Sequence, residues 1–372
     1  MVRRWPLQSG ALPSNEKDGH TMKGLRGILC ILGSMLAAGS SAAQTYPGTY
    51  PQTKLSNGVL GATIYLPDAE KGFYRGTRFD WAGVIGALEY KGHSYFSPFF
   101  EKFNPAVPDV VIGDPVEAGV NSAASGAVEE FIGADGSVPG YAEAKPDEAF
   151  CKIGVGALRK LDNASYSSYA NYAILNGGKR TVKSGRDWIE FTQQVDCGSG
   201  YGYAYTKTIR LLKNEPEMTI EHRLVNTGEK PIETRVYDHN FLPIDHQSTG
   251  PNVVITFPFV PEPTQALNGI AMVRGNRLVF PKDLKGGDTF DSEFRGFGKT
   301  ATDYQIQVEN HKTGAGVTIR GDRPLVNLEV WAVRTVVAPE PYIEIKVAAG
   351  REFNWKYTYH FYTVPAAKDE GK

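Results

Sequence analysis

The sequence has little cysteine and lacks the short motifs of several common catalytic chemistries. It holds three cysteines among 372 residues, and none lies in a Cys-x-x-Cys or His-rich setting. This spacing argues against a zinc site. The chain also has no glycine-rich phosphate loop and no nucleophile elbow. Nucleotide binding and α/β-hydrolase chemistry are therefore not indicated.

An excess of charge of either sign is missing as well. Forty Lys and Arg residues face 41 Asp and Glu residues, which gives a formal net charge of −1 at pH 7. The sequence shows no basic stripe. These features argue against nucleic acid and anionic membranes as partners.

Long apolar runs are absent beyond the first 43 residues. Residues 22–26 are basic, residues 27–39 are apolar, and residues 41–43 are small, which is the pattern of a secretory signal. The apolar run is too short for a permanent membrane span. We therefore expect a signal peptide within residues 1–43 and a periplasmic or secreted mature protein without a membrane span. Residues 1–21 are polar and unpatterned, which is compatible with a start codon assigned too early.

Removal of the signal peptide would also remove Cys30 and leave two cysteines in the mature chain. Cys151 and Cys197 are then the candidate disulfide pair, because an oxidising compartment permits the bond. The alternative is two free thiols. Neither cysteine points to a metal site.

What the chain does contain favours an all-β fold. It has 41 Gly, 19 Tyr and 18 Phe residues, and short alternating segments separated by turn residues replace helical periodicity. We expect a surface arm over residues 44–54, a single domain over residues 55–365 and a polar tail over residues 366–372. Many long strands in succession imply a large antiparallel β-sandwich with sheets packed face to face.

The alternating segments predict individual strands, and one weaker stretch predicts a short helix near Val116–Phe131. The clearest strand is Glu352–Tyr362, whose odd-numbered positions from Phe353 to Phe361 are all aromatic. Other strands are expected over Lys152–Leu158, Ser165–Leu175, Lys179–Val195 and Tyr201–Leu212.

Residues 217–245 predict a long hairpin around which the rest of the chain is organised. A polar turn over residues 226–231 joins two alternating segments, and the second segment ends near His239. Alternation places Arg235, Tyr237, His239 and Phe241 on one face of that strand and Val236, Asp238, Asn240 and Leu242 on the other. A face that combines Arg, Tyr and His suits a cleft better than a core. The nearby His222 has apolar neighbours on its own face and is expected in the core.

This hairpin resembles the galactose mutarotase-like (aldose 1-epimerase-like) superfamily. The motif is a hydrophobic strand with Val-Asn-Thr-Gly, then Pro, then His-Asn-Phe. A second similarity covers Ala338-Pro339-Glu340-Pro341 and the following Ala-Gly-Arg-Glu-Phe at residues 349–353. The resemblance spans roughly the last 150 residues. It implies a β-supersandwich and action on a mono- or oligosaccharide without a cofactor.

The resemblance also implies two catalytic residues. In these enzymes a glutamate takes the proton of the anomeric hydroxyl while a histidine protonates the ring oxygen, so Glu340 would be the base and His239 the acid. The prolines on either side of Glu340 remove backbone donors and restrict its conformation. We therefore expect Glu340 on a stiff bulge or loop and not in a regular ladder.

Further side chains are candidates for sugar binding. Arg78, Asp80 and Trp81 lie in one short segment, where Trp can stack on a sugar ring and the charged groups can hold hydroxyls or a carboxylate. A structural ion pair at a sheet edge is the alternative for this segment. The remaining candidates are Arg235, Tyr237 and Asp245.

The sequence departs from the superfamily in one respect. Typical galactose mutarotases carry a second histidine in a His-Gly-Gly setting, and this chain has none. Two other functions therefore remain open on the same fold. One is a polysaccharide or uronate lyase that uses Tyr237, His239 and arginines, and the other is a non-catalytic carbohydrate-binding module.

Overall fold

The computed structural model describes residues 50–100, 102–107 and 121–365. All of them belong to one compact unit that spans residues 49–372. Within these ranges the regular structure is β-strand, apart from two short 3-10 helices, η1 (Ile244–His246) and η2 (Ala301–Asp303). The all-β prediction is confirmed. No helix in the described ranges is both long and apolar enough to cross a membrane.

Ten strands form the larger sheet, and every neighbouring pair in it is antiparallel. In spatial order the strands are β11 (Lys179–Ser184), β12 (Trp188–Gly198), β13 (Tyr201–Leu211), β14 (Glu217–Asn226), β25 (Glu352–Thr363), β22 (Ala315–Gly321), β21 (Gln305–Asn310), β16 (Val253–Thr256), β19 (Arg277–Val279) and β18 (Met272–Arg274).

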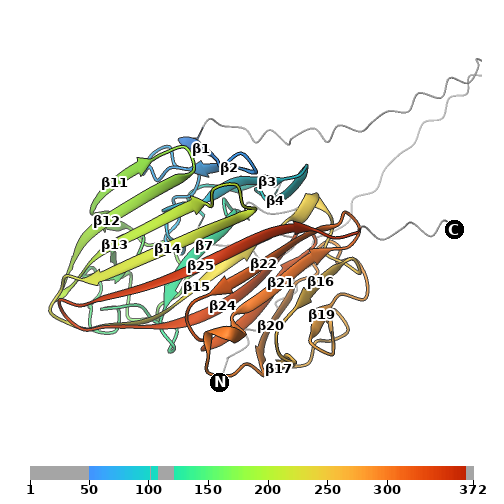
Figure 1. The fold of residues 1–372 in the computed structure, drawn as a ribbon. Coiled ribbons are helices and arrows are strands. Elements are labelled where there is room, and N and C mark those ends of the chain that lie inside the picture. Colours follow the sequence, from blue (N-terminus) through green and yellow to red (C-terminus); the bar gives the residue numbers. More distant parts are fainter. Residues whose placement is uncertain (1–49, 101, 108–120, 366–372) are drawn as a thin grey trace, which may run out of the picture. The chain divides into compact units, whose positions relative to one another are not determined.

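Six strands form a second antiparallel sheet behind the first one in the view of Figure 1. In spatial order they are β17 (Glu262–Pro263), β20 (Phe290–Arg295), β23 (Asn327–Val333), β24 (Val336–Val347), β15 (Ile232–Phe241) and β7 (Gly126–Ile132). The hairpin expected over residues 217–245 is thus split between the sheets, because β14 lies in the larger one and β15 in the smaller one. The large antiparallel sandwich is confirmed.

Three small sheets complete the described structure. The first has β1 (Gln52–Ser56), β2 (Leu60–Tyr65), β3 (Ile85–Tyr90) and β4 (His93–Phe96); the second has β8 (Ala149–Lys152), β9 (Gly156–Arg159) and β10 (Ile174–Asn176); the third is the parallel pair β5 (Phe103–Asn104) and β6 (Asn121–Ser122). A disulfide bond between Cys151 of β8 and Cys197 of β12 ties the second small sheet to the ten-stranded sheet.

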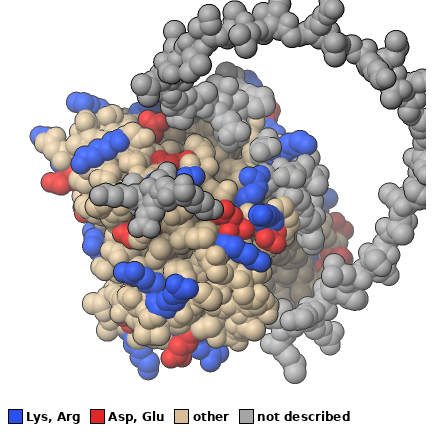
Figure 2. Space-filling model, turned by 90° about the vertical axis from the view of Figure 1, so that its right-hand side faces the viewer, with Lys and Arg blue, Asp and Glu red and all other residues tan. Residues whose placement is uncertain are grey.

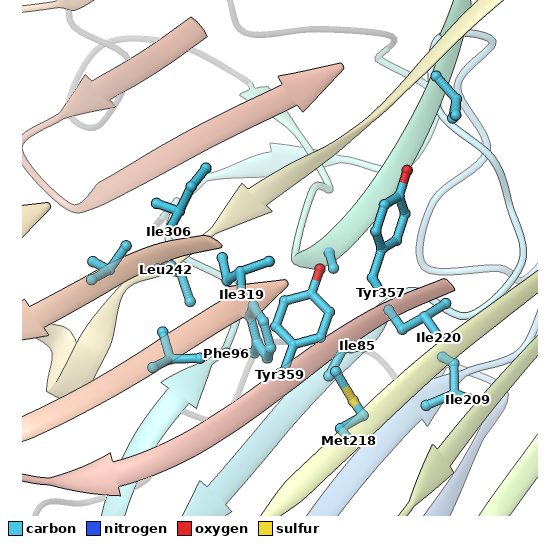
Figure 3. Packing of buried hydrophobic residues seen from close by; sticks show 14 of the residues in the cluster. Ile85, Phe96, Ile209, Met218, Ile220, Leu242, Ile306, Ile319, Tyr357 and Tyr359 are labelled. Carbon is cyan, nitrogen blue, oxygen red and sulfur yellow. The ribbon is translucent and has the colours of Figure 1, made fainter. Parts of the chain in front are cut away.

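The main core lies between the two large sheets and follows the alternation of the sequence. On β25, Trp355, Tyr357, Tyr359 and Phe361 are buried while most of the intervening side chains are exposed or half-buried. Figure 3 shows Tyr357 and Tyr359 beside aliphatic residues of neighbouring strands, among them Ile220 of β14 and Ile319 of β22. Burying an aliphatic side chain of this size stabilises the fold by about 1.5–3 kcal/mol.

The surface mixes charges of both signs. On the face drawn in Figure 2, Lys and Arg side chains alternate with Asp and Glu side chains. This agrees with the formal net charge of −1.

The predicted helix near Val116–Phe131 is wrong where it can be checked. Residues 116–120 lie outside the described residues, and the rest contains β6 and β7. Gly126 has a φ of +75°, and a Cβ there would lie 2.6 Å from Ile85 Cβ. Pairing of β7 with β15, from Ile132 opposite Arg235 to Gly126 opposite Phe241, overrides the helical composition of this stretch.

The strand predictions succeed for the long alternating segments and fail around turns. The segments 201–212 and 352–362 are β13 and β25. By contrast, 179–195 is a hairpin of β11 and β12, and 152–158 spans the end of β8 and the start of β9. Most of 165–175 is irregular, because only its last two residues belong to β10.

Candidate functional site

Strand β15 presents its two faces to different surroundings. Tyr237, His239 and Phe241 lie on the face turned away from the ten-stranded sheet, where Phe241 joins a second apolar cluster with Phe79. Val236 lies on the opposite face in the core between the sheets. The alternation predicted for this strand is confirmed.

His239 and Glu340 are direct neighbours on adjacent strands. Tyr237 pairs with Tyr342, and Leu242 pairs with Val337 in the same register, which places His239 opposite Glu340. Their closest atoms, His239 Nε2 and Glu340 Oε1, lie 3.1 Å apart. The fold thus brings together the two residues that the resemblance implies.

Both members of this His239–Glu340 pair are buried. His239 is 4% exposed and Glu340 is 3% exposed. The His239 ring stacks on Phe241 at a centroid distance of 3.7 Å, and Trp331 approaches it edge-on at 5.6 Å. Its Nδ1 has no hydrogen-bond partner among the described residues. The pair therefore sits in a largely aromatic environment.

This environment shifts the two pKa values in opposite directions. Burial lowers the pKa of His239 well below its usual value, and the positive charge of Arg78 lowers it further. Burial also raises the pKa of Glu340 well above its usual value, and the neighbouring Glu329 raises it further. These shifts favour a neutral His239 and a protonated Glu340 at neutral pH. The pair is then an uncharged contact with its proton on Glu340, not an ion pair.

Acidic residues continue along the sheet from Glu340. Glu329 lies opposite Glu340 on β23, and its carboxylate accepts a hydrogen bond from the Tyr342 hydroxyl at 3.2 Å. Burial and a hydrogen bond with Asp291 raise the pKa of Glu329 to about 8. Close carboxyl groups cannot all ionise together, so this side of the site holds protons near neutral pH.

A charged group flanks His239 on the other side. Glu130 of β7 accepts hydrogen bonds from Arg78 Nε at 2.6 Å, the Tyr237 hydroxyl at 2.6 Å and Lys152 Nζ at 3.0 Å. Burial alone would raise the pKa of Glu130, but Lys152 and Arg78 lower it well below its usual value. The Arg78 guanidinium also donates to the Tyr237 hydroxyl at 2.9 Å. Two cations thus surround one carboxylate beside the pair.

Glu340 does not project from a bulge or loop, as its flanking prolines had suggested. Pro339, Glu340 and Pro341 lie inside β24, and the ladder with β23 runs through all three residues without a break. The ladder with β15 stops at Tyr237 and Tyr342. The missing proline N–H groups therefore face β15, and the intact ladder with β23 keeps Glu340 in an extended strand.

The other predicted binding residues lie in different places. Asp80 is 1% exposed and lies 3.8 Å from Lys207 Nζ, on the back of the site between the two large sheets. Trp81 is buried, and its indole N–H donates to the Gly76 carbonyl at 2.7 Å. Arg78 and Tyr237 lie beside the His239–Glu340 pair, whereas Asp80 does not.

Two further candidates lie away from the pair. Arg235 is half-buried on β15, opposite Glu344 and Ile132 of the neighbouring strands. Asp245 lies in η1, where its carboxylate contacts His93 Nδ1 at 2.9 Å and accepts the Ser94 N–H at 2.8 Å. Their predicted role in sugar binding stays a prediction.

Behind β15 lies a second group of ionisable side chains, which we call the back cluster: Asp80, Glu129, Lys207 and His222. His222 Nε2 lies 2.6 Å from Glu129 Oε1, and Lys207 pairs with the other oxygen of that carboxylate. Burial raises the pKa of Glu129, but Lys207 and His222 reverse this effect and lower it to about 2. His222 is buried among aromatic rings, as expected.

Sequence reasoning missed Glu130, Lys152 and Glu329. Glu130 was not recognised because its segment was predicted to be helical. On the observed strand β7, the adjacent Glu129 and Glu130 point to opposite faces, which a helix would not allow. A signal existed for Glu329, since it stands two residues before Trp331 on an alternating strand. Among the described residues, no group of three His, Cys, Asp or Glu side chains is arranged to hold a metal ion.

Comparisons with known proteins agree with the fold. No protein-family model matches the sequence, and no curated protein matches it significantly. Among solved structures, the GalM/aldose epimerase homologue of C. elegans is 11% identical with a TM-score of 0.50, and the match covers 85% of this chain and 100% of that one. A galactose mutarotase-like protein of Clostridium acetobutylicum is also 11% identical with a TM-score of 0.50, with 84% and 95% covered. The described chain therefore has the galactose mutarotase-like fold.

Proposed function

We propose that this protein acts on carbohydrate by aldose 1-epimerase-like acid/base chemistry, with His239 and Glu340 as the catalytic pair. One observation carries the proposal: the two side chains meet at 3.1 Å inside the sheet of a galactose mutarotase-like fold. Burial shifts their pKa values in opposite directions, and strongly shifted pKa values are common among catalytic groups.

The reaction needs one base and one acid. The base removes the proton of the anomeric hydroxyl, the acid protonates the ring oxygen, and the bond between C1 and the ring oxygen breaks. Rotation about the bond from C1 to C2 and closure of the ring with reversed proton transfers give the other anomer. The reaction consumes no co-reactant and leaves both catalytic groups as they began.

The proton of the pair starts on Glu340, whereas the roles implied by the resemblance require it on His239. The two forms differ only by transfer of that proton from Glu340 Oε1 to His239 Nε2, which are already 3.1 Å apart. Hydrogen bonds from sugar hydroxyls would favour an ionised Glu340, as the charge of Arg78 already does. A sugar ring does not fit into the present gap, so binding must also move the two side chains apart.

The test is to follow mutarotation of freshly dissolved α-aldohexoses and α-aldopentoses by polarimetry. Glu340→Gln and His239→Gln are each expected to lower kcat/KM by roughly 10²–10⁴-fold, which is the usual contribution of a general acid or base. Glu344→Gln is the matched control. Glu344 lies on the same face of β24 but is exposed and pairs with Lys346 at 3.0 Å. The kcat/KM of Glu344→Gln should therefore stay within about twofold of wild type.

Absence of catalysis by the wild-type protein on every free aldose would overturn the epimerase proposal. The same preparations would then be tested on uronate oligosaccharides, with ultraviolet absorbance of the unsaturated product as readout. A lyase is the second candidate because Arg78 donates to Tyr237 beside His239, and such a group can neutralise a uronate carboxylate. Calorimetric binding without turnover would favour the carbohydrate-binding module.

We also propose that the protein is exported. The signal-like pattern of residues 22–43 supports this location, as does the disulfide between Cys151 and Cys197, because such bonds persist in oxidising compartments. N-terminal sequencing of protein from the periplasm or medium should begin after Ala43. Recovery of full-length protein in the cytoplasm alone would contradict export.

A further inference from the structure

The two strands that carry the catalytic pair lose their backbone contacts at the pair itself. The ladder between β15 and β24 breaks after Tyr237 opposite Tyr342 and returns only as an isolated bridge at Leu242 opposite Val337. Pro339 and Pro341 lie in this gap and cannot donate a hydrogen bond. Without a substitute, the strands could separate where His239 must face Glu340.

The side chain of Asn240 occupies this gap. It is fully buried, and its Nδ2 donates to the Pro339 carbonyl of β24 at 2.9 Å and to the Asp238 carbonyl of β15 at 3.0 Å. One amide therefore ties the two strands together next to the pair. A buried amide with both hydrogens bonded has little freedom to move.

The facing sheet fixes the orientation of that amide. Tyr359 projects from β25 into the space between the sheets (Figure 3), and its hydroxyl lies 2.7 Å from Asn240 Oδ1 and 2.7 Å from Asp238 Oδ2. A hydroxyl has a single hydrogen and an amide oxygen can only accept, so the Tyr359 hydroxyl donates to Asn240 Oδ1 and can accept a hydrogen bond from the Asp238 carboxyl group. Burial raises the pKa of Asp238 well above its usual value, so its carboxyl group can supply the second hydrogen.

We propose that Asn240 is a positioning residue for the His239–Glu340 pair, and that Tyr359 orients it from the opposite sheet. The Asn240 amide supplies one hydrogen bond from β15 to the Pro339 carbonyl of β24 and a second one within β15, in the gap where Pro339 and Pro341 cannot donate. It thereby holds the strand of the acid and the strand of the base at a fixed separation. The catalytic consequence of this role rests on the proposed function, whereas the geometric consequence does not.

The chain offers a matched control for this role. Asn226 is also fully buried, and its Nδ2 donates to the Lys230 carbonyl at 2.8 Å and to the Val347 carbonyl of β24 at 2.9 Å. The two asparagines thus make the same kind of bridge to the same strand. Val347 lies at the far end of β24 from Glu340, so Asn226 should affect stability without affecting the pair.

The experiment compares Asn240→Ala, Asn226→Ala and Tyr359→Phe in the full chain. Two readouts are measured: steady-state mutarotation, and the ¹⁵N chemical shifts of His239, assigned with His239→Gln. We expect Asn240→Ala to shift the His239 resonances and to lower kcat by at least about tenfold with KM within about threefold, because misplaced catalytic groups act mainly on the chemical step. Tyr359→Phe should shift the His239 resonances and lower kcat in the same direction, but by a smaller amount.

Asn226→Ala is expected to lower the melting temperature about as much as Asn240→Ala while leaving kcat within about twofold and the His239 resonances unmoved. Equal shifts of the His239 resonances in the two alanine variants would overturn the positioning role. Unchanged His239 resonances in Asn240→Ala or in Tyr359→Phe would overturn it as well. If Asn240→Ala does not fold, Tyr359→Phe decides the matter. If the wild type has no mutarotase activity, the proposed function fails, and the His239 shifts alone decide whether Asn240 positions the pair.

Discussion

Buried carboxyl groups lie on both sides of the sheet that contains β7, β15 and β24, and two of them, Glu129 and Glu340, are held differently. In the back cluster, Glu129 is paired with Lys207 and His222, and its pKa is lowered to about 2. On the other side, which we call the front, Glu340 of β24 contacts the neutral His239 and lies opposite Glu329, and its pKa is raised well above its usual value. Burial is equally complete in both places. The neighbouring charges therefore decide whether a buried carboxyl group is fixed as an anion or keeps a transferable proton.

This difference separates a structural role from a chemical one. A buried anion with a matched cation stabilises one arrangement and resists titration. A buried carboxyl group that keeps its proton beside a neutral imidazole can take part in acid/base chemistry once a bound ligand stabilises the other protonation state. Three predictions test the comparison, from the largest expected effect to the smallest.

The first prediction removes the cation of the back cluster. Lys207→Met leaves Glu129 and Asp80 buried without their positive partner, which should lower the free energy of unfolding by about 3–5 kcal/mol. Urea denaturation at neutral pH measures the change. Lys183→Met is the control, because Lys183 forms an exposed pair with Glu190 at 3.6 Å and such pairs contribute about 0–1 kcal/mol. A loss below about 1 kcal/mol for Lys207→Met would mean that the back cluster is not a paired structural unit.

The second prediction concerns the pH dependence of stability on the front face. The pKa of Glu329 is about 8 in the folded protein, above its ordinary value of 4.5, so the folded state binds this proton more tightly than the unfolded state does. Its contribution to stability is complete below pH 4.5 and is lost as the pH rises towards 8. Between pH 4.5 and pH 8 the free energy of unfolding of the wild type should fall by roughly 1–3 kcal/mol more than that of Glu329→Gln, which lacks this titrating group.

The opposite sign is expected for Glu129, whose folded pKa is about 2. Its contribution is present above pH 4.5 and is lost as the pH falls towards 2. The contribution of Glu129 to the free energy of unfolding should therefore stay constant between pH 5 and pH 8, as measured by denaturation curves across this range. Parallel pH profiles for wild type and Glu329→Gln would contradict the raised pKa of Glu329.

The third prediction has the smallest effect on stability. Glu340→Gln replaces a protonated acid with a neutral group of the same shape, so the free energy of unfolding should change by less than about 1 kcal/mol at pH 7. Glu129→Gln, in contrast, leaves the buried Lys207 charge without its carboxylate partner and should lower the free energy of unfolding by about 3 kcal/mol or more. Equal costs for the two variants would show that Glu340 is ionised in the resting protein. Because Glu340→Gln should nevertheless abolish most of the mutarotation, stability and activity separate at this residue.

The sequence indicated much of the architecture because alternation is a local property. The aromatic series of β25 and the two faces of β15 could be read directly, since successive side chains of a strand point to opposite sides. The same reading failed for β7, where Ala and Glu favour a helix locally. Pairing with β15 and the close approach of Gly126 to Ile85 decide the strand there.

The candidate site was predicted in part. His239 and Glu340 were named from motifs, but their contact depends on a register between strands that lie far apart in the sequence. The same holds for Glu130, whose partners Arg78, Tyr237 and Lys152 come from three other segments. No local pattern encodes such a convergence.

The sequence by itself thus indicated the long alternating strands such as β13 and β25, the alternation on β15 and two candidate catalytic residues. The tertiary structure decided which buried carboxyl group meets a cation, which meets a neutral imidazole, and how Asn240 closes the gap left by two prolines. The physical reason is the range of the interactions. Side-chain direction is set within one strand, whereas charge pairing and desolvation depend on neighbours that only folding brings together.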